Sequence, residues 1–176
     1  MVPQLKSTKV LIVGKGTGWE KAQEFLNKAD WNIWVIPQSY RLLQSHLIDL
    51  VFEVHEPSLW RKKRNIIQEV NNIYRPPRLI VTHQVPRYTD NSYLLPIEDI
   101  QKLELPLINT FAWMLAYAIH RGCTEVALRG INLDYAHEAY LERDGLMYIL
   151  GYIQALGIKL DIDNESGINI KTWNPS

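Results

Sequence analysis

The sequence predicts an α/β protein in which a mainly parallel sheet of about six strands lies between two layers of helices. Two observations predict this fold class. Short apolar segments alternate with longer amphipathic or apolar segments along the chain, and the short segments end at glycine, proline or histidine. Alternation of this kind is typical of βαβ units, whose parallel strands are covered on both faces.

Six segments have the length and composition of strands: residues 9–13, 32–36, 49–54, 78–82, 125–128 and 158–162. Four segments predict helices: residues 19–29, 59–73, 110–120 and 140–156. Gly157 stands where a helix C-terminal cap is expected. Gly151 falls in mid-helix, where glycine costs about 1 kcal/mol relative to alanine, so close packing is expected there. The elements together predict one Rossmann-like three-layer sandwich over residues 1–176.

Two segments have little periodicity. Residues 85–107 contain three prolines and are expected to form an irregular connection or lid, and residues 172–176 a C-terminal tail. The run 110–120 is apolar nearly all round, which predicts a helix buried against the sheet.

Composition excludes several classes of protein. A chain of 176 residues fits one domain, and 19 Lys plus Arg balance 19 Asp plus Glu, so there is no strong nucleic-acid signal. One cysteine excludes an intrachain disulfide and favours a reducing compartment. The longest apolar run, 111–119, is shorter than the roughly 20 residues of a membrane span. We therefore expect a cytoplasmic protein with no membrane partner.

Charge is unevenly distributed along this neutral chain. Residues 57–90 hold seven Lys or Arg against two acids, and residues 131–165 hold seven acids against two bases. The basic run 61–64 is expected to be a solvated helix face. Opposed charge and 6 Trp with 9 Tyr leave room for self-association, so a homodimer is a further expectation.

Gly14, Lys15, Gly16, Thr17 and Gly18 directly follow the first predicted strand and precede the first helix. Glycines there let the backbone approach a ligand, and a helix N-terminus suits a phosphate. No Gly-Lys-Ser/Thr ends the segment, so it is not a Walker A loop. No acidic residue ends the second strand, which disfavours NAD. Two alternatives remain: an anion site, or a tight turn without a ligand.

Three histidines follow predicted strands. His55 and His83 come after the third and fourth strands, and His137 lies in the loop after the fifth. A histidine at such an edge can act as a catalytic base or as a hydrogen-bond partner. The alternative is that each histidine only caps its strand. The spacing matches no standard metal motif, so no metal site is predicted.

Four further side chains are candidates for ligand binding. Asn109 and Thr110 begin the apolar helix, where they either cap it or contact a ligand. Tyr140 and Arg143 fall in the first turn of the last predicted helix. Arginine there opposes the helix dipole, which favours a bound anion or a neighbouring carboxylate as its partner.

The order of several motifs resembles that of small Rossmann-like proteins found in bacteriophages and prophages. The motifs are the strand and turn at 10–19, Phe52-Glu53-Val54-His55, Leu95-Pro96-Ile97-Glu98, the helix at 110–119, Gly130-Ile131-Asn132, and Tyr140-Leu141-Glu142-Arg143. More distantly, the chain is similar to MptE-like hydroxymethylpterin diphosphokinases, motility accessory factor sugar transferases and family 42 sialyltransferases. Those families bind phosphorylated nucleotides or nucleotide sugars at the same glycine turn.

The resemblance implies a phosphorylated nucleoside or sugar nucleotide as ligand, with no other cofactor identified. It adds Asn132 to the binding candidates, at a position where the phage-type group has aspartate. If that aspartate serves catalysis in the relatives, this chain binds without turnover. A phage-encoded chain would work in the host cytoplasm.

Four functions therefore stay open. The first is a binder of a phosphorylated nucleoside or sugar nucleotide at the carboxyl edge of the sheet. The second is a nucleotide-dependent glycosyl- or phosphotransferase, with His55, His83 or His137 as base. The third is a phage accessory protein that sequesters or modifies a nucleotide signal, and the fourth is an interaction protein without a ligand.

Overall fold

The computed structural model describes residues 3–73, 78–132 and 136–163 of the chain. Its sheet has seven strands in the order β5-β4-β3-β2-β1-β6-β7, and every neighbouring pair is parallel. The strands are β1 (Lys9–Val13), β2 (Asn32–Val35), β3 (Leu50–Glu53), β4 (Leu79–Val81), β5 (Tyr93–Leu94), β6 (Glu125–Arg129) and β7 (Lys159–Ile162). The predicted parallel sheet is confirmed, with seven strands rather than about six.

The strand order reverses once. From β1 the chain adds β2, β3, β4 and β5 on one side, and then β6 and β7 on the other side. In open α/β sheets, ligands bind beyond the carboxyl ends of the strands, at the point where the order reverses. In this protein that point lies between β1 and β6.

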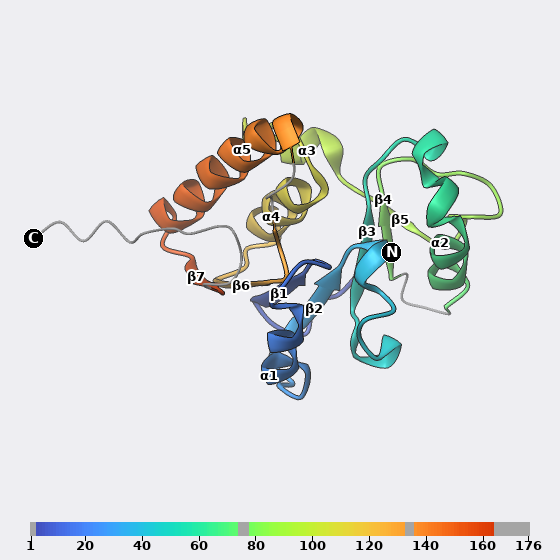
Figure 1. Ribbon diagram of the computed structural model, residues 1–176, viewed down its shortest axis with the longest axis horizontal. Helices are drawn as coiled ribbons and strands as arrows, with labels where there is room; N and C mark the ends of the chain where they lie inside the picture. Colours follow the sequence, from blue (N-terminus) through green and yellow to red (C-terminus); the bar gives the residue numbers. More distant parts are fainter. Residues whose placement is uncertain (1–2, 74–77, 133–135, 164–176) are drawn as a thin grey trace, which may run out of the picture.

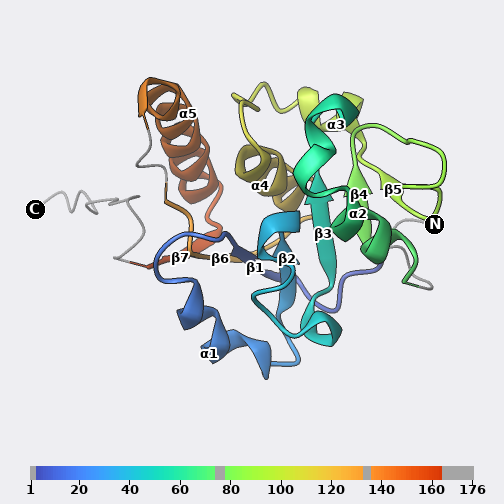
Figure 2. The same ribbon diagram turned by 45° about the vertical axis from the view of Figure 1, so that its right-hand side comes forward.

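Helices cover both faces of the sheet, which gives three layers. One face carries α3 (Ile97–Gln101), α4 (Thr110–His120) and α5 (Ala136–Ala155). The other carries α1 (Gln23–Leu26), α2 (Arg64–Asn71) and the 3-10 helices η1 (Trp19–Ala22) and η4 (Pro57–Lys62). Two short 3-10 helices, η2 (Pro37–Ser39) and η3 (Ser45–Leu47), connect β2 to β3. Figures 1 and 2 show α4 and α5 on one side of the central strands and α1 on the other. The Rossmann-like sandwich is thus confirmed.

The strands of the centre are apolar on both faces. In β1, Val10 and Ile12 belong to the core beneath α4 and α5, whereas Leu11 and Val13 belong to the core beneath α1 and α2. All four side chains are fully buried. A strand buried on both faces loses the alternation of polar and apolar residues, which explains the continuous apolar runs in the sequence.

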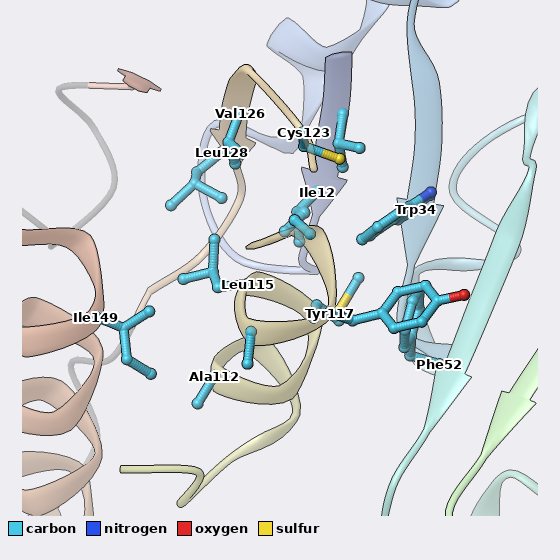
Figure 3. Packing of buried hydrophobic residues seen from close by; sticks show 14 of the residues in the cluster. Ile12, Trp34, Phe52, Ala112, Leu115, Tyr117, Cys123, Val126, Leu128 and Ile149 are labelled. Carbon is cyan, nitrogen blue, oxygen red and sulfur yellow. The ribbon is translucent and has the colours of Figure 1, made fainter. Parts of the chain in front are cut away.

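An aromatic group fixes α4 to the middle of the sheet. Trp34 of β2, Phe52 of β3 and Tyr117 of α4 are buried, with ring centroids 5.1 to 5.6 Å apart (Figure 3). Aromatic contacts at these distances are stabilising beyond the area that they bury. These contacts fix the C-terminal half of α4 against β2 and β3.

Two predicted helices differ from the observed ones. The first, expected over 19–29, is η1 followed by the four residues of α1, and Gly18 provides no side-chain cap for it. The second, expected over 59–73, is η4 followed by α2. Lys63, with φ −120°, interrupts it between the two.

The segment 85–107 is more regular than its sequence predicts. It contains α3 and β5, and β5 pairs in parallel with β4 through Ile80↔Tyr93 and Val81↔Leu94. A strand of two residues is too short for an alternating pattern, which is why the sequence did not indicate it. The tail expected at 172–176 lies outside the described residues.

The last helix begins earlier than expected and ends as expected. It starts at Ala136, and Gly157 caps its other end with φ 75°. The amides of Gly157 and Ile158 donate to the carbonyls of Gln154 and Ile153, the pattern of a Schellman motif. The close packing expected at Gly151 is wrong, because a Cβ there would meet nothing within 4 Å. Among the described residues, no helix combines the length and the apolar character that crossing a membrane requires.

Candidate functional site

The turn of residues 14–18, hereafter the glycine turn, lies where the strand order reverses. Val13 of β1 is level with Arg129 of β6, so Gly14 and Gly130 leave the sheet side by side. The amide of Gly14 donates to the carbonyl of Arg129 at 2.9 Å, and that of Gly16 donates to the carbonyl of Gly130 at 2.7 Å. The amides between and after them, those of Lys15, Thr17 and Gly18, have no acceptor within the described part of the chain.

Part of the glycine pattern is explained by packing of the chain on itself. A Cβ at Gly14 would lie 2.2 Å from the carbonyl oxygen of Gly130. Gly130 has φ 63°, and a Cβ there would lie 2.6 Å from the Cβ of Trp19. The tight-turn alternative therefore accounts for Gly14 and Gly130. It does not account for the amides of Lys15, Thr17 and Gly18, which have no acceptor among the described residues. Lys15 and Thr17 are exposed.

The helix after the glycine turn contributes little to anion binding. It begins as the 3-10 helix η1 and continues as only four α-helical residues. A macrodipole needs aligned peptide units over several turns, so the expected helix-terminus site is not formed here. Any anion at this turn would be held by individual amides and by the Lys15 side chain.

Asn132 and Asn109 each contain one buried polar atom without a partner. The Oδ1 atom of Asn132 accepts no hydrogen bond in the described part of the chain. A Cβ at Gly16 would lie 2.8 Å from the Cγ of Asn132, so this side chain lies against the glycine turn. Asn109 is confirmed as the N-cap of α4, since its Oδ1 accepts from the amide of Ala112 at 2.8 Å. Its Nδ2 atom has no partner among the described residues.

A second polar region lies at the ends of β3 and β4, and we call it the histidine cluster. It consists of Glu53, His55, Glu56, Lys63, Thr82 and His83. Glu53 is fully buried at the last position of β3, and Lys63 is 7% exposed. The Nζ atom of Lys63 lies 2.6 Å from Oε2 of Glu53, an ion pair rather than a well-aligned hydrogen bond.

Glu53 also positions His55. Its Oε1 atom accepts from the backbone amide of His55 at 3.0 Å and lies 2.7 Å from Nδ1 of the ring. Nδ1 is also 2.9 Å from Nζ of Lys63. Because a carboxylate only accepts and an ammonium only donates, Nδ1 can serve one of them, and the shorter contact assigns its proton to Glu53. Nε2 then carries the lone pair of a side chain that is 42% exposed.

The protonation of Glu53 follows from these contacts. Burial raises the pKa of Glu53, but the hydrogen bond from His55 and the close contact and charge of Lys63 outweigh it. The pKa of this carboxyl therefore lies below its ordinary value. Trp60, itself buried, donates from Nε1 to the carbonyl of His55 at 2.9 Å and so fixes the backbone beside the ring.

His83 has a different pair of partners. Thr82 donates its only hydroxyl proton to the carbonyl of Val54 at 3.0 Å, so its oxygen can only accept from Nδ1 of His83, 3.0 Å away. Nε2 of His83 lies 3.2 Å from Oε1 of Glu56. Both ring nitrogens of His83 therefore face acceptors, whereas only one nitrogen of His55 does.

The two histidines lie level on neighbouring strands. Glu53 of β3 is the register partner of Val81 of β4, and His55 and His83 each follow two residues later. The amide of Thr82 still donates to the carbonyl of Glu53 at 3.3 Å, so pairing continues towards them. β2 separates this pair of strands from β1, so the histidine cluster and the glycine turn occupy different parts of one edge. Figure 2 shows β3 and β4 beside α2.

The remaining predicted site residues belong to α5 and α4. His137 lies in α5 rather than in a loop, and the side chains of His137 and Tyr140 are outside the described residues. Because α5 begins at Ala136, Arg143 is its eighth residue and not in its first turn. The helix-dipole argument for an anion at Arg143 is therefore wrong, and its side chain is exposed. Thr110, the first residue of α4, is 8% exposed.

Lys63 is the residue that sequence reasoning missed. It was expected on a solvated face within the basic run 61–64, but it is buried and paired. A signal was present in its spacing, since Trp60, Lys63, Ile67 and Val70 recur at helical intervals and are all buried. Cys123 is buried in the core beneath α4 and α5. Burial raises the pKa of its thiol to about 11.

Arg129 attaches the segment after the glycine turn to the sheet. Its guanidinium lies 3.1 Å from carboxylate oxygens of Glu24 and Asp161 and 4.8 Å from the ring centroid of Phe25. These contacts join α1 to β6 and β7. We assign Arg129 a structural role, because its partners all belong to the packed chain.

The described residues contain no group of three or more histidine, cysteine or acidic side chains that could hold a metal ion. A scan of protein-family models and searches of curated proteins and of solved structures found no match to this chain. The fold and its edge therefore define the class: an α/β Rossmann-like sandwich with polar groups at the carboxyl ends of its strands.

Proposed function

We propose that the protein binds a phosphorylated nucleoside or a sugar nucleotide at the carboxyl edge of its sheet, with a phosphate at the glycine turn. The observation that carries the proposal is the pattern of amides in this turn. The amide of Gly14 donates to Arg129 at the end of β6, and that of Gly16 donates to Gly130, the next residue. The amides of Lys15, Thr17 and Gly18 have no acceptor among the described residues. Unpaired amides in a turn form a concave set of donors that suits an anion.

Two further features support this position. The strand order reverses between β1 and β6, which is where ligands bind in sheets of this type. Asn132, beside the turn, has a buried oxygen that a ligand hydroxyl or amine would satisfy. Lys15 is exposed on the turn and adds a positive charge.

The test is a thermal-unfolding series with ADP and UDP-glucose, each compared with its unphosphorylated nucleoside. At about 100 times its dissociation constant, a ligand stabilises the folded protein by about 2.7 kcal/mol, which is a readable shift in Tm. We expect a shift with the phosphorylated compounds and not with adenosine or uridine. Equal shifts with nucleosides and nucleotides would contradict a phosphate site.

A pair of lysine variants places the ligand. Lys15→Ala removes the charge on the glycine turn and is expected to weaken binding about tenfold, a typical loss for one charge-assisted contact. Lys28→Ala is the matched control, because Lys28 is also exposed but precedes β2 at the opposite edge of the sheet. An equal loss in both variants would indicate a general charge effect instead of a site at the turn.

A nucleotide-dependent transferase is the second candidate, and one observation favours it. Buried Glu53 holds Nδ1 of the partly exposed His55, which leaves Nε2 to accept a proton. A histidine oriented through Nδ1 by a carboxylate is the usual arrangement of a general base.

A further inference from the structure

We propose that His55 and His83 form an acid–base pair, in which His55 is the base and His83 the acid, for cleavage of a phosphate diester of a nucleoside. The proposal rests on the ligand class of the proposed function, and it adds a reaction and two distinct roles. It is carried by the geometry of the histidine cluster.

The first step of the argument is position. The two rings follow register partners on adjacent parallel strands, which lie about 4.8 Å apart in a sheet. Their side chains are 42% and 43% exposed, so both are accessible to a ligand at the same edge. Nδ1 of His55 contacts Glu53, and Nδ1 of His83 contacts Thr82. In both rings Nε2 is therefore the nitrogen that can exchange a proton with a substrate.

The second step is the difference between their partners. Nε2 of His55 has no hydrogen-bond partner in the described part of the chain, and its Nδ1 proton is assigned to Glu53. Nε2 of His83 faces the carboxylate of Glu56 at 3.2 Å, while its Nδ1 faces a hydroxyl oxygen that can only accept. His55 is thus arranged to receive a proton at Nε2, and His83 to give one from Nε2. Glu56 is 66% exposed and can move aside when a substrate oxygen takes its place.

The third step is charge. The segment 57–64, which follows His55, has four bases and no acid, and three of the four, Arg61, Lys62 and Arg64, are exposed. The guanidinium of Arg64 lies 5.0 Å from the ring centroid of Tyr88, so this basic segment contacts the loop after His83. That loop also carries the exposed Arg87. Both histidines are therefore flanked by positive charge, which favours an anionic substrate.

The reaction balances without a metal, cofactor or redox partner. A water molecule, or an acceptor hydroxyl in its place, attacks phosphorus and gives its proton to Nε2 of His55. The bond from phosphorus to the leaving oxygen breaks, and that oxygen takes the Nε2 proton of His83. With water the products are a nucleoside monophosphate and an alcohol, and with an acceptor hydroxyl they are a new phosphate diester and an alcohol. One proton passes from His55 to His83 through solvent before the next turnover.

The test compares two esters of thymidine 5′-phosphate that differ in the leaving group, p-nitrophenyl and phenyl. Nitrophenolate leaves without a proton, whereas phenolate benefits from general acid catalysis. Variants to asparagine keep a side-chain nitrogen near the position of Nδ1 and remove Nε2, so the contacts to Glu53 and Thr82 are retained. The matched control is His46→Asn, because His46 is exposed in η3 and precedes β3 at the opposite edge.

We expect His55→Asn to lower kcat/KM for both esters by about 10²–10⁴-fold, the usual contribution of one general base. We expect His83→Asn to lower kcat/KM strongly for the phenyl ester. The fold loss for the p-nitrophenyl ester should be at least ten times smaller. His46→Asn should leave both values unchanged. An equal loss for both esters in His83→Asn would overturn its assignment as the acid.

The failure of this inference is distinguishable from that of the proposed function. A wild-type protein that binds thymidine 5′-phosphate but cleaves neither ester overturns the acid–base pair and leaves the binding function intact. Cleavage with the expected leaving-group dependence, together with Tm shifts for ADP and UDP-glucose that equal those for adenosine and uridine, supports the pair and removes the phosphate from the glycine turn.

Discussion

The glycine turn and the histidine cluster lie at the same edge of the sheet, and each depends on two parallel strands held in register. The glycine turn is built from main-chain atoms: Gly14 and Gly16 bond to the carbonyls of Arg129 and Gly130, and Gly14 is too close to Gly130 for any side chain. The histidine cluster is built from side chains: a buried ion pair, two imidazoles and a hydroxyl.

This difference determines what each region can do. Main-chain amides are fixed donors, neither gain nor lose protons at ordinary pH, and suit binding. The side chains of the cluster exchange protons and suit acid–base chemistry. The two regions are also disrupted by different kinds of substitution. The glycine turn is sensitive to added volume, whereas the cluster is sensitive to the loss of one charge.

The largest effect is expected when the buried ion pair is broken. Lys63→Met leaves the Glu53 carboxylate buried without its cation, and such variants lose about 3–5 kcal/mol. Urea unfolding measures the loss, and Lys62→Met, at an exposed neighbouring position, should stay within about 0.5 kcal/mol of wild type. The double variant Glu53→Gln/Lys63→Met should recover part of the loss. A loss below about 1 kcal/mol in Lys63→Met would show that the pair does not anchor α2.

The next effect is expected when volume is added to the glycine turn. A Cβ at Gly14 would lie 2.2 Å from a carbonyl oxygen, so Gly14→Ala must displace β1 or β6. Such overpacking costs about 1–3 kcal/mol. Gly151→Ala is the control, since that position is open and helical, and it should gain up to about 1 kcal/mol. Similar changes at both positions would mean that the turn relaxes freely.

A graded effect is expected from acid. The pKa of Glu53 is lower in the folded protein than its ordinary value of 4.5, so Glu53 stabilises the fold above that pH. This contribution is lost as pH falls through the folded pKa. The difference in unfolding free energy between wild type and Glu53→Gln should therefore shrink from pH 7 to pH 3. Asp30 and Asp99, whose pKa values are also lowered, are common to both proteins. A constant difference over this range would assign the acid response to those groups.

The smallest effects separate Asn132, beside the glycine turn, from Asn109, the N-cap of α4. Asn109→Ala removes the cap of α4 and should cost about 1 kcal/mol. Asn132→Ala removes an oxygen that has no partner in the described chain, so stability should change by less than about 0.5 kcal/mol. Affinity for ADP or UDP-glucose should fall in Asn132→Ala, and calorimetric titration measures it. Unchanged affinity would leave Asn132 outside the ligand site.

The sheet could be predicted because parallel strands that are buried on both faces consist of consecutive apolar residues, which are visible in the sequence. β1 and α4 were predicted with the bounds that the structure shows. β5 could not be predicted, because two residues are too few to show the alternating hydrophobic pattern of a strand. η1 and α1 were predicted as one helix, because local composition does not reveal that Gly18 leaves the start of the helix uncapped.

The part of the candidate site that directly follows predicted strands could be predicted, because such residues lie at the carboxyl edge of a parallel sheet. The histidines at 55 and 83 were placed at neighbouring strand ends, and the structure puts them level. Lys63 was hidden because three exposed bases surround it, and only its helical spacing from Trp60 distinguishes it. Arg143 was wrongly placed in the first turn of α5, because that placement depended on the residue at which the helix begins. The position of a helix end is harder to predict from sequence than the presence of the helix.

The single cysteine offers a way to follow both regions in one measurement. Cys123 is 2% exposed between α4 and β6, and its thiol has a pKa of about 11, so it is unreactive while the sandwich is closed. Reagents that trap thiolates can therefore modify this chain at Cys123 only after the central layer opens. The rate of modification in native buffer reports the population of open molecules. Variants of the glycine turn and of the histidine cluster can be compared on that scale without denaturant or ligand.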